Sequence, residues 1–246
     1  GTPIEAWIAE KTLAANPKTD GLVKGNWFAN DLHGEWARGR AKQNLSAWLA
    51  KPGNSETSPN RPKHPPEPGA MWTYGIDRLK HFNLRGVIWY QGESNAELLK
   101  DVLCYRDTLP LLISSWRKTF RDESLPVLVV QLPRIDNAPS RVEWPAFRQI
   151  QREVANATAG VELAVPLELG DARRRGNVHP ATKQPVGERL ADVAMRTAYG
   201  KPIAGAVAPQ LKSATTTNGQ FVVTFNTFGC TLKLHKDAFP NKDGFG

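Results

Sequence analysis

The sequence predicts an α/β fold with a doubly wound parallel sheet. Three short, continuously apolar segments lie at residues 85–90, 126–132 and 161–167, and such segments are typical of strands buried on both faces. Segments with helical periodicity separate them, as in parallel sheets that helices cover on both sides. The 246 residues suffice for one domain of this kind, predicted over residues 1–200, and for part of a second.

Helices are expected before, between and after these strands. Thr2, Pro3 and Glu5 form a capping-box pattern, which predicts a helix start. Residues 52–69 carry six prolines and two glycines and are expected to be loop. Pro110 is expected to break the helix in which it lies. The predicted helical segments are 32–51, 96–120, 143–158 and 182–199.

The pattern of apolar and polar residues changes after residue 200, and residues 201–246 are expected to form the beginning of a truncated, β-rich domain. Residues 220–225 and 230–234 alternate apolar and polar side chains, as antiparallel strands do. No evident closing element follows them in the sequence.

Composition argues against several classes of function. Lys and Arg (32) outnumber Asp and Glu (24) and give a net charge of +8. The basic residues are spread along the chain without the interleaved aromatics of RNA-binding surfaces, so no nucleic-acid partner is expected. No apolar run of about 18 residues exists, so no membrane span is expected. Cys104 and Cys230 fit no metal-ligand spacing, and their disulfide state is left open. No metal or cofactor is predicted.

Two polar segments follow predicted strands. The first, Gln91–Asn95, packs Gln, Gly, Glu, Ser and Asn into one turn. Amides and backbone N–H groups at such a turn are what an oxyanion hole needs, and Glu93 can orient an imidazole. The alternative is an ordinary strand-to-helix turn in which Asn95 caps the helix.

The second polar segment runs from Asp171 to His179 and ends at Pro180. A histidine on such a loop can act as general base for a serine, with Asp171 as its acid partner. The alternative is a structural histidine. Open parallel sheets place their sites beyond the carboxyl ends of the strands, where both polar segments are expected.

Five segments together resemble the sialate O-acetylesterase family of SGNH hydrolases. They are GTPIEAW at the start, GVIWYQGESNAE, YRDTLPLLISSWRKTF, PVLVVQL and VHPATKQPVGERLA, in that order along the chain. The resemblance implies a flavodoxin-like three-layer sandwich that hydrolyses acetyl esters on sugars, possibly sialic acids, without a metal. It also implies a serine nucleophile and a histidine base, and it favours a periplasmic or secreted location.

The resemblance also assigns individual residues. His179 matches the family's catalytic histidine, and Glu93 matches a proposed acid partner. Gln91, Gly92 and Asn95 fall in the segment that helps to build the oxyanion site. The family's serine lies in a Gly-Gln-Ser-Asn turn upstream of GTPIEAW that is missing here, so the chain alone is expected to be inactive.

Other assignments remain open. Residues 176 and 177 are Gly and Asn, where the family often has its acid, so Asp171 competes with Glu93 for that role. Ser94 is a rival nucleophile, because Gly92 to Ala96 imitates a nucleophile elbow. A non-catalytic carbohydrate-binding fragment is a further alternative. Within Arg173–Arg175, Arg174 either receives the carboxylate of an acidic sugar or belongs to a solvated charge run.

Overall fold

The structure, a computed structural model, describes residues 1–135, 141–170 and 177–232, and it contains the predicted parallel sheet. Strands β1 (Val87–Trp89), β2 (Val127–Val130) and β3 (Val161–Ala164) lie in the order β1-β2-β3. Both pairings are parallel. The three strands coincide with the three apolar segments of the sequence.

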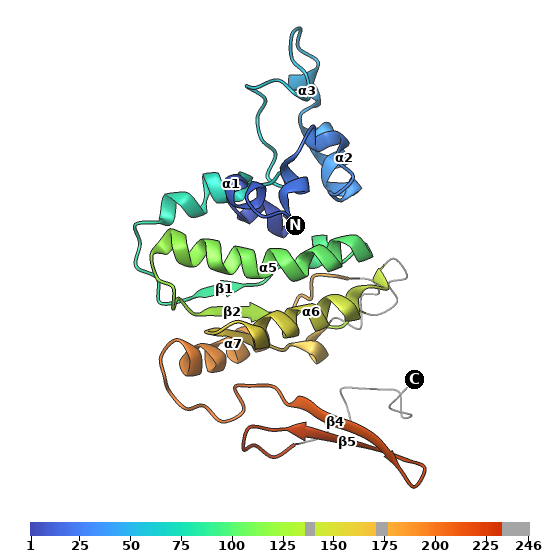
Figure 1. Ribbon diagram of the computed structural model, residues 1–246, viewed down its shortest axis with the longest axis vertical. Coiled ribbons are helices and arrows are strands. Elements are labelled where there is room, and N and C mark those ends of the chain that lie inside the picture. Colours follow the sequence, from blue (N-terminus) through green and yellow to red (C-terminus); the bar gives the residue numbers. More distant parts are fainter. Residues whose placement is uncertain (136–140, 171–176, 233–246) are drawn as a thin grey trace.

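Helices cover both faces of this sheet (Figure 1). Helices α5 (Leu99–Phe120) and α6 (Trp144–Ala157) pack against each other over one face and share its hydrophobic core. Helix α7 (Gln184–Thr197) covers β2 and β3 on the opposite face. The doubly wound arrangement is therefore confirmed. Ile88 of β1 points to the face of α7 but is 60% exposed, because α7 does not reach it.

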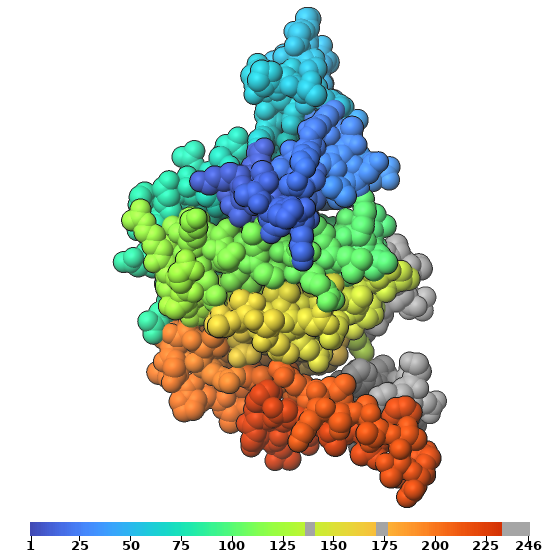
Figure 2. Space-filling model, viewed as in Figure 1, coloured from blue at the N-terminus to red at the C-terminus, as the bar shows by residue number. Residues whose placement is uncertain are grey.

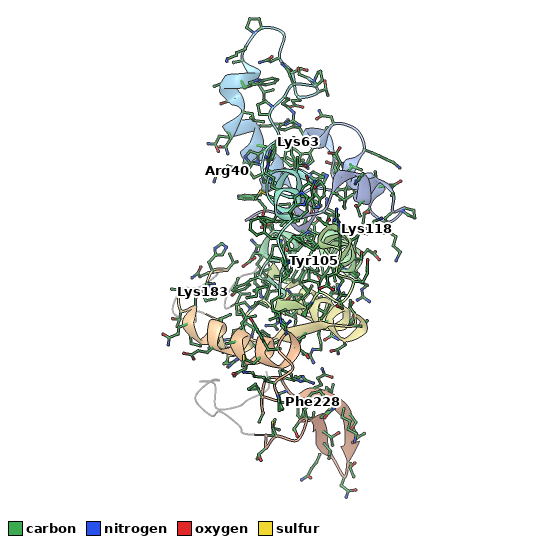
Figure 3. The ribbon with its side chains drawn as sticks, turned by 90° about the vertical axis from the view of Figure 1, so that its left-hand side faces the viewer. Arg40, Lys63, Tyr105, Lys118, Lys183 and Phe228 are labelled. Carbon is green, nitrogen blue, oxygen red and sulfur yellow. The ribbon has the colours of Figure 1, made fainter. Side chains whose placement is uncertain are left out.

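Helix α5 continues through Pro110, so the predicted break is wrong. A proline inside a helix removes one backbone hydrogen bond. Buried side chains before and after it, including Tyr105, Leu109 and Trp116, hold both halves of the helix against the core. This packing outweighs the local loss, and Figure 3 shows Tyr105 in the interior of the molecule.

The N-terminal part consists of short helices and the predicted proline-rich loop, which lie at one end of the long axis (Figures 1 and 2). Ile4 and Ile8 are completely buried in the core. The helices here are η1 (Ile4–Trp7), α1 (Glu10–Ala14), η2 (Asp20–Val23), η3 (Trp27–Ala29), α2 (Glu35–Asn44), α3 (Ser46–Leu49), α4 (Ala70–Tyr74) and η4 (Ile76–Leu79).

The predicted capping box at the start of the chain is wrong. Pro3 occupies the cap position of η1 and makes no side-chain bond to it. The Thr2 hydroxyl instead accepts a hydrogen bond from Trp7 Nε1 at 2.8 Å. Glu5 is buried rather than folded back over the helix start, because polar partners inside the protein bind its carboxylate.

An antiparallel hairpin, β4 (Gln210–Thr217) and β5 (Gln220–Asn226), lies at the other end of the long axis (Figure 1). The strand predicted at 220–225 is confirmed. That at 230–234 is wrong for residues 230–232, which form no strand, and its last two residues lie outside the described ranges. The division into domains at residue 200 stays a prediction. No described helix is both long and apolar enough to span a membrane.

Candidate active site

The polar turn after β1 lies directly against helix α6. Gly92 follows the strand, and η5 (Glu93–Asn95) completes the turn. A Cβ atom on Gly92 would lie 2.4 Å from Cε1 of Phe147. Only glycine therefore allows this close approach, which fixes the turn above the buried aromatic core.

Two amide side chains of the turn bind the N-terminal segment. Asn95 Oδ1 accepts hydrogen bonds from the Ile4 N–H at 3.0 Å and from Gln91 Nε2 at 2.8 Å. Gln91 Nε2 also donates to the Thr2 carbonyl at 3.2 Å. Asn95 does not cap helix α5, whose cap residue is Leu98, so the alternative interpretation of Asn95 as a cap is wrong. Whether either amide also serves an oxyanion stays a prediction.

A buried carboxylate extends this network away from the turn. Asn95 Nδ2 donates to Glu5 Oε2 at 3.2 Å, and Glu5 Oε1 lies 3.2 Å from Nδ1 of His33. His33 Nε2 lies 2.7 Å from the Leu22 carbonyl. Glu5 and His33 are both buried. The sequence interpretation missed this pair because the two residues lie in different segments, without a recognisable spacing.

The second polar segment brings His179 to the same edge of the sheet. The Asn177 side chain both accepts from the His179 N–H and donates to the His179 carbonyl, each at 3.0 Å. His179 itself is exposed, and its ring has no hydrogen-bond partner within the described ranges. Lys183, labelled in Figure 3, lies over the ring of Tyr90 at 4.7 Å and joins the start of α7 to the end of β1.

A cavity of ≈ 220 Å³ joins the two polar segments. Its wall includes Glu93, Ser94 and Asn95 from the first segment and His179 from the second. The remaining lining residues are Gly1, Pro3, Glu5, Gly34, Trp36, Ala37, Glu97, Asp101, Arg141 and Val178. Asp171 and Arg174 lie outside the described residues. Their predicted roles, like those of the other site residues, stay predictions.

The ionisable side chains around the turn are held by hydrogen bonds, and burial shifts the pKa values of two of them. Glu93 Oε2 accepts the Gly92 N–H at 3.1 Å, and Arg141 donates to the Glu93 carbonyl at 2.7 Å. Burial, together with the negative charge of Glu93, raises the pKa of Tyr90 to about 12, so its phenol stays neutral. Burial raises the pKa of Asp101 to about 6.

Ser94 lines the cavity, but its hydroxyl is not bonded to a histidine, as the hydroxyl of a catalytic serine is. Its hydroxyl donates to the Gly1 carbonyl at 3.1 Å. A nucleophile elbow leads from its strand directly into a helix. Here the serine lies in η5, and helix α5 begins only at Leu99.

The cavity wall and the other described residues contain acidic and histidine side chains. Within them no group of three or more His, Cys, Asp and Glu side chains is arranged to hold a metal ion. Cys104 and Cys230 are free thiols. Burial raises the pKa of Cys104 to about 12, so it is no nucleophile at neutral pH.

Known proteins are similar to this chain over most of its length. Residues 4–196 match the profile of the family described as carbohydrate esterase, sialic acid-specific acetylesterase. Sialate O-acetylesterase from Mus musculus is 29% identical over 217 residues, which are 82% of this chain and 38% of the relative. That from Homo sapiens is 29% identical over 197 residues, 74% of this chain and 36% of the relative.

A solved structure is similar as well. A carbohydrate acetylesterase from Xanthomonas citri superposes with a TM-score of 0.62 at 26% identity, covering 93% of this chain and 42% of that one. The chain thus spans about two fifths of the length of these three relatives.

Proposed function

The chain belongs to the sialic acid-specific acetylesterase family of carbohydrate esterases, and we propose that its cavity is the histidine-bearing part of a site that hydrolyses acetyl esters on sugar hydroxyls. The observation that carries the proposal is that one cavity joins Glu93 and Ser94, which follow β1, to His179, which follows β3. The relatives named sialate O-acetylesterases make an acetylated sialate the first substrate to test.

In the proposed mechanism His179 acts as general base. It takes the proton of a serine hydroxyl while the oxygen attacks the acetyl carbonyl, and it returns that proton to the leaving sugar oxygen. Water then hydrolyses the acetyl-enzyme by the same route and releases acetate. We assign the nucleophile to a serine outside residues 1–246, because these residues contain no Gly-Gln-Ser-Asn turn and the Ser94 hydroxyl donates its hydrogen bond to the Gly1 carbonyl.

In this proposal Glu93 is the acid partner of His179, and its position also decides whether the Gly92 N–H is free to bind the oxyanion. Its carboxylate now accepts the Gly92 N–H. In the proposed site this side chain turns toward His179 and orients the imidazole, which releases the Gly92 N–H to donate to the developing oxyanion. Asp171 is the competing acid. Because Gln91 and Asn95 have backbone or carboxylate partners, we assign their amides to holding the turn and leave the oxyanion to the backbone.

The test is acetate release from O-acetylated sugars by a longer chain that continues upstream of Gly1 and by the chain of residues 1–246. We expect turnover only from the longer chain. Acetate release by the shorter chain that Ser94→Ala abolishes would refute the external serine and establish Ser94 as nucleophile. If the longer chain binds acetylated sugars but releases no acetate, the non-catalytic alternative holds.

A further inference from the structure

A buried histidine and a buried carboxylate lie behind the turn that follows β1. The side chains of His33 and Glu5 are only 1% and 7% exposed. Nδ1 of His33 lies 3.2 Å from Glu5 Oε1, and the other carboxylate oxygen, Oε2, accepts a hydrogen bond from Asn95 Nδ2 at 3.2 Å. His33 is not among the described residues that line the cavity, so its polar contact with the turn runs through Glu5 and Asn95.

The surroundings of His33 determine how many hydrogens the pair holds. Nε2 lies 2.7 Å from the Leu22 carbonyl, which can only accept, so Nε2 carries a hydrogen. Nδ1 faces a carboxylate oxygen of Glu5. A hydrogen has to lie between these two atoms, because two lone pairs would otherwise oppose each other in a buried site. Glu5 and His33 therefore form a pair without net charge, and Glu5 Oε2 is left to accept.

This pair fixes the orientation of the Asn95 amide. Because Glu5 Oε2 accepts, the NH2 group of Asn95 points to Glu5 and its oxygen points to the turn. That oxygen accepts hydrogen bonds from the Ile4 N–H at 3.0 Å and from Gln91 Nε2 at 2.8 Å. A flipped amide would place its oxygen against the carboxylate and its NH2 group against two donors, so it would leave these buried partners unpaired.

We infer that Glu5 and His33 are positioning residues of the proposed active site, which act on the turn of residues 92–95 through the Asn95 amide. The oxyanion N–H and the acid partner of the proposed mechanism both belong to this turn. The inference rests on the proposed function for its effect on catalysis. The alternative is a pair that only stabilises the fold. The two differ in which ring nitrogen matters, because Nδ1 leads to the turn and Nε2 contacts η2.

Two substitutions of His33 separate these roles. The amide nitrogen of asparagine takes the place of Nδ1 and that of glutamine the place of Nε2, so each variant keeps one of the two contacts. In the longer chain, His33→Gln should lower the kcat for acetate release about tenfold with little change in KM, because the turn loses its support. His33→Asn should stay within about threefold of the parent kcat, although it also loses one buried hydrogen bond.

Glu5→Gln and His64→Gln provide the controls, with urea unfolding to show that each variant is folded in the assay. Glutamine at position 5 can accept from Asn95 and donate to a neutral His33, so Glu5→Gln should also stay within about threefold of the parent kcat. His64 is buried as well, but its ring contacts Asn44 away from the cavity. His64→Gln should therefore lower the unfolding free energy without lowering kcat.

Amide NMR signals of residues 1–246 test the positioning without turnover. The Gly92 N–H and the Asn95 NH2 signals should move in His33→Gln and stay close to the parent positions in His33→Asn. In an active longer chain, a parent-like kcat of His33→Gln or equal losses in both His33 variants would overturn the inference and leave the proposed function intact. A loss of about tenfold in Glu5→Gln would overturn it too, whether or not the His33 variants fold.

A longer chain that releases no acetate would refute the proposed function alone. The NMR signals then decide the positioning of the turn. Signals that move equally in both His33 variants, or in neither, would overturn the inference.

Discussion

Replacement of Asp101 by asparagine is expected to stabilise the folded chain at neutral pH. Burial raises the pKa of this carboxyl group from its ordinary 3.8 to about 6. The positive charge of Lys100 opposes the rise, Glu5 and Glu97 add to it, and His33 opposes it. Asparagine has nearly the same shape and never carries the charge that burial disfavours.

The direction of the pH effect follows from the two pKa values of Asp101. Between pH 3.8 and about 6 the folded chain keeps a proton that the unfolded chain has released. Stability therefore falls as the pH rises through this window, and the loss is constant above it. At pH 8 the loss of unfolding free energy is complete, with an upper limit of about 3 kcal/mol. At pH 4 it is well under about 1 kcal/mol.

Urea unfolding followed by circular dichroism at pH 4 and pH 8 measures the effect. The advantage of Asp101→Asn over the parent chain should be greater at pH 8 by about 2 kcal/mol. Other titrating groups are common to both proteins and cancel in this difference. Asp192→Asn, on the exposed side of α7, should show no such change. An advantage that is equal at both pH values, or a less stable variant at pH 8, would refute the argument.

Three further substitutions test the packing of the site and the sheet by unfolding and association measurements. Gly92→Ala should cost at least about 2 kcal/mol because its methyl group would overlap Phe147, whereas Gly39→Ala, with open space on α2, should cost nothing or stabilise the helix. Asn95→Ala should cost about 1–3 kcal/mol, since it leaves buried partners unpaired. Because Ile88 leaves an apolar position of the sheet exposed, we expect the chain to self-associate, and Ile88→Lys should reduce this association in sedimentation. Equal unfolding free energies for the two glycine variants would contradict the first prediction, and equal values for the parent chain and Asn95→Ala the second. Unchanged sedimentation of Ile88→Lys would contradict the third.

Local patterns predict the central sheet because its strands are buried on both faces and therefore continuously apolar. The hairpin shows where that signal fails. Strand β4 is polar and exposed, so alternation does not mark it. Asn218 and Gly219 between β4 and β5 both have positive φ, at 50° and 74°. An Asn-Gly pair is the strongest short-range signal of a hairpin, and it identifies β4 where hydrophobicity does not.

The candidate site is only partly predictable from the sequence. The rule that sites lie beyond the carboxyl ends of parallel strands leads to the turn at Glu93 and the loop at His179. Glu5 and Trp36 reach the same cavity from helices distant in sequence, through tertiary packing, whereas Asp101 lies on the helix that follows the turn at Glu93. Glu5 also satisfies a capping pattern, and only its burial beside polar partners reveals another role.

The most direct test of the central claim is the kcat/KM for acetate release by the longer chain with His179 replaced by alanine. We expect a loss of at least about a thousandfold with unchanged unfolding free energy, because the residue is exposed and its imidazole has no described partner. His81→Ala, at an exposed histidine outside the cavity, should retain the parent rate. A His179→Ala variant that retains most of the parent rate would contradict the assignment of this cavity as the catalytic site.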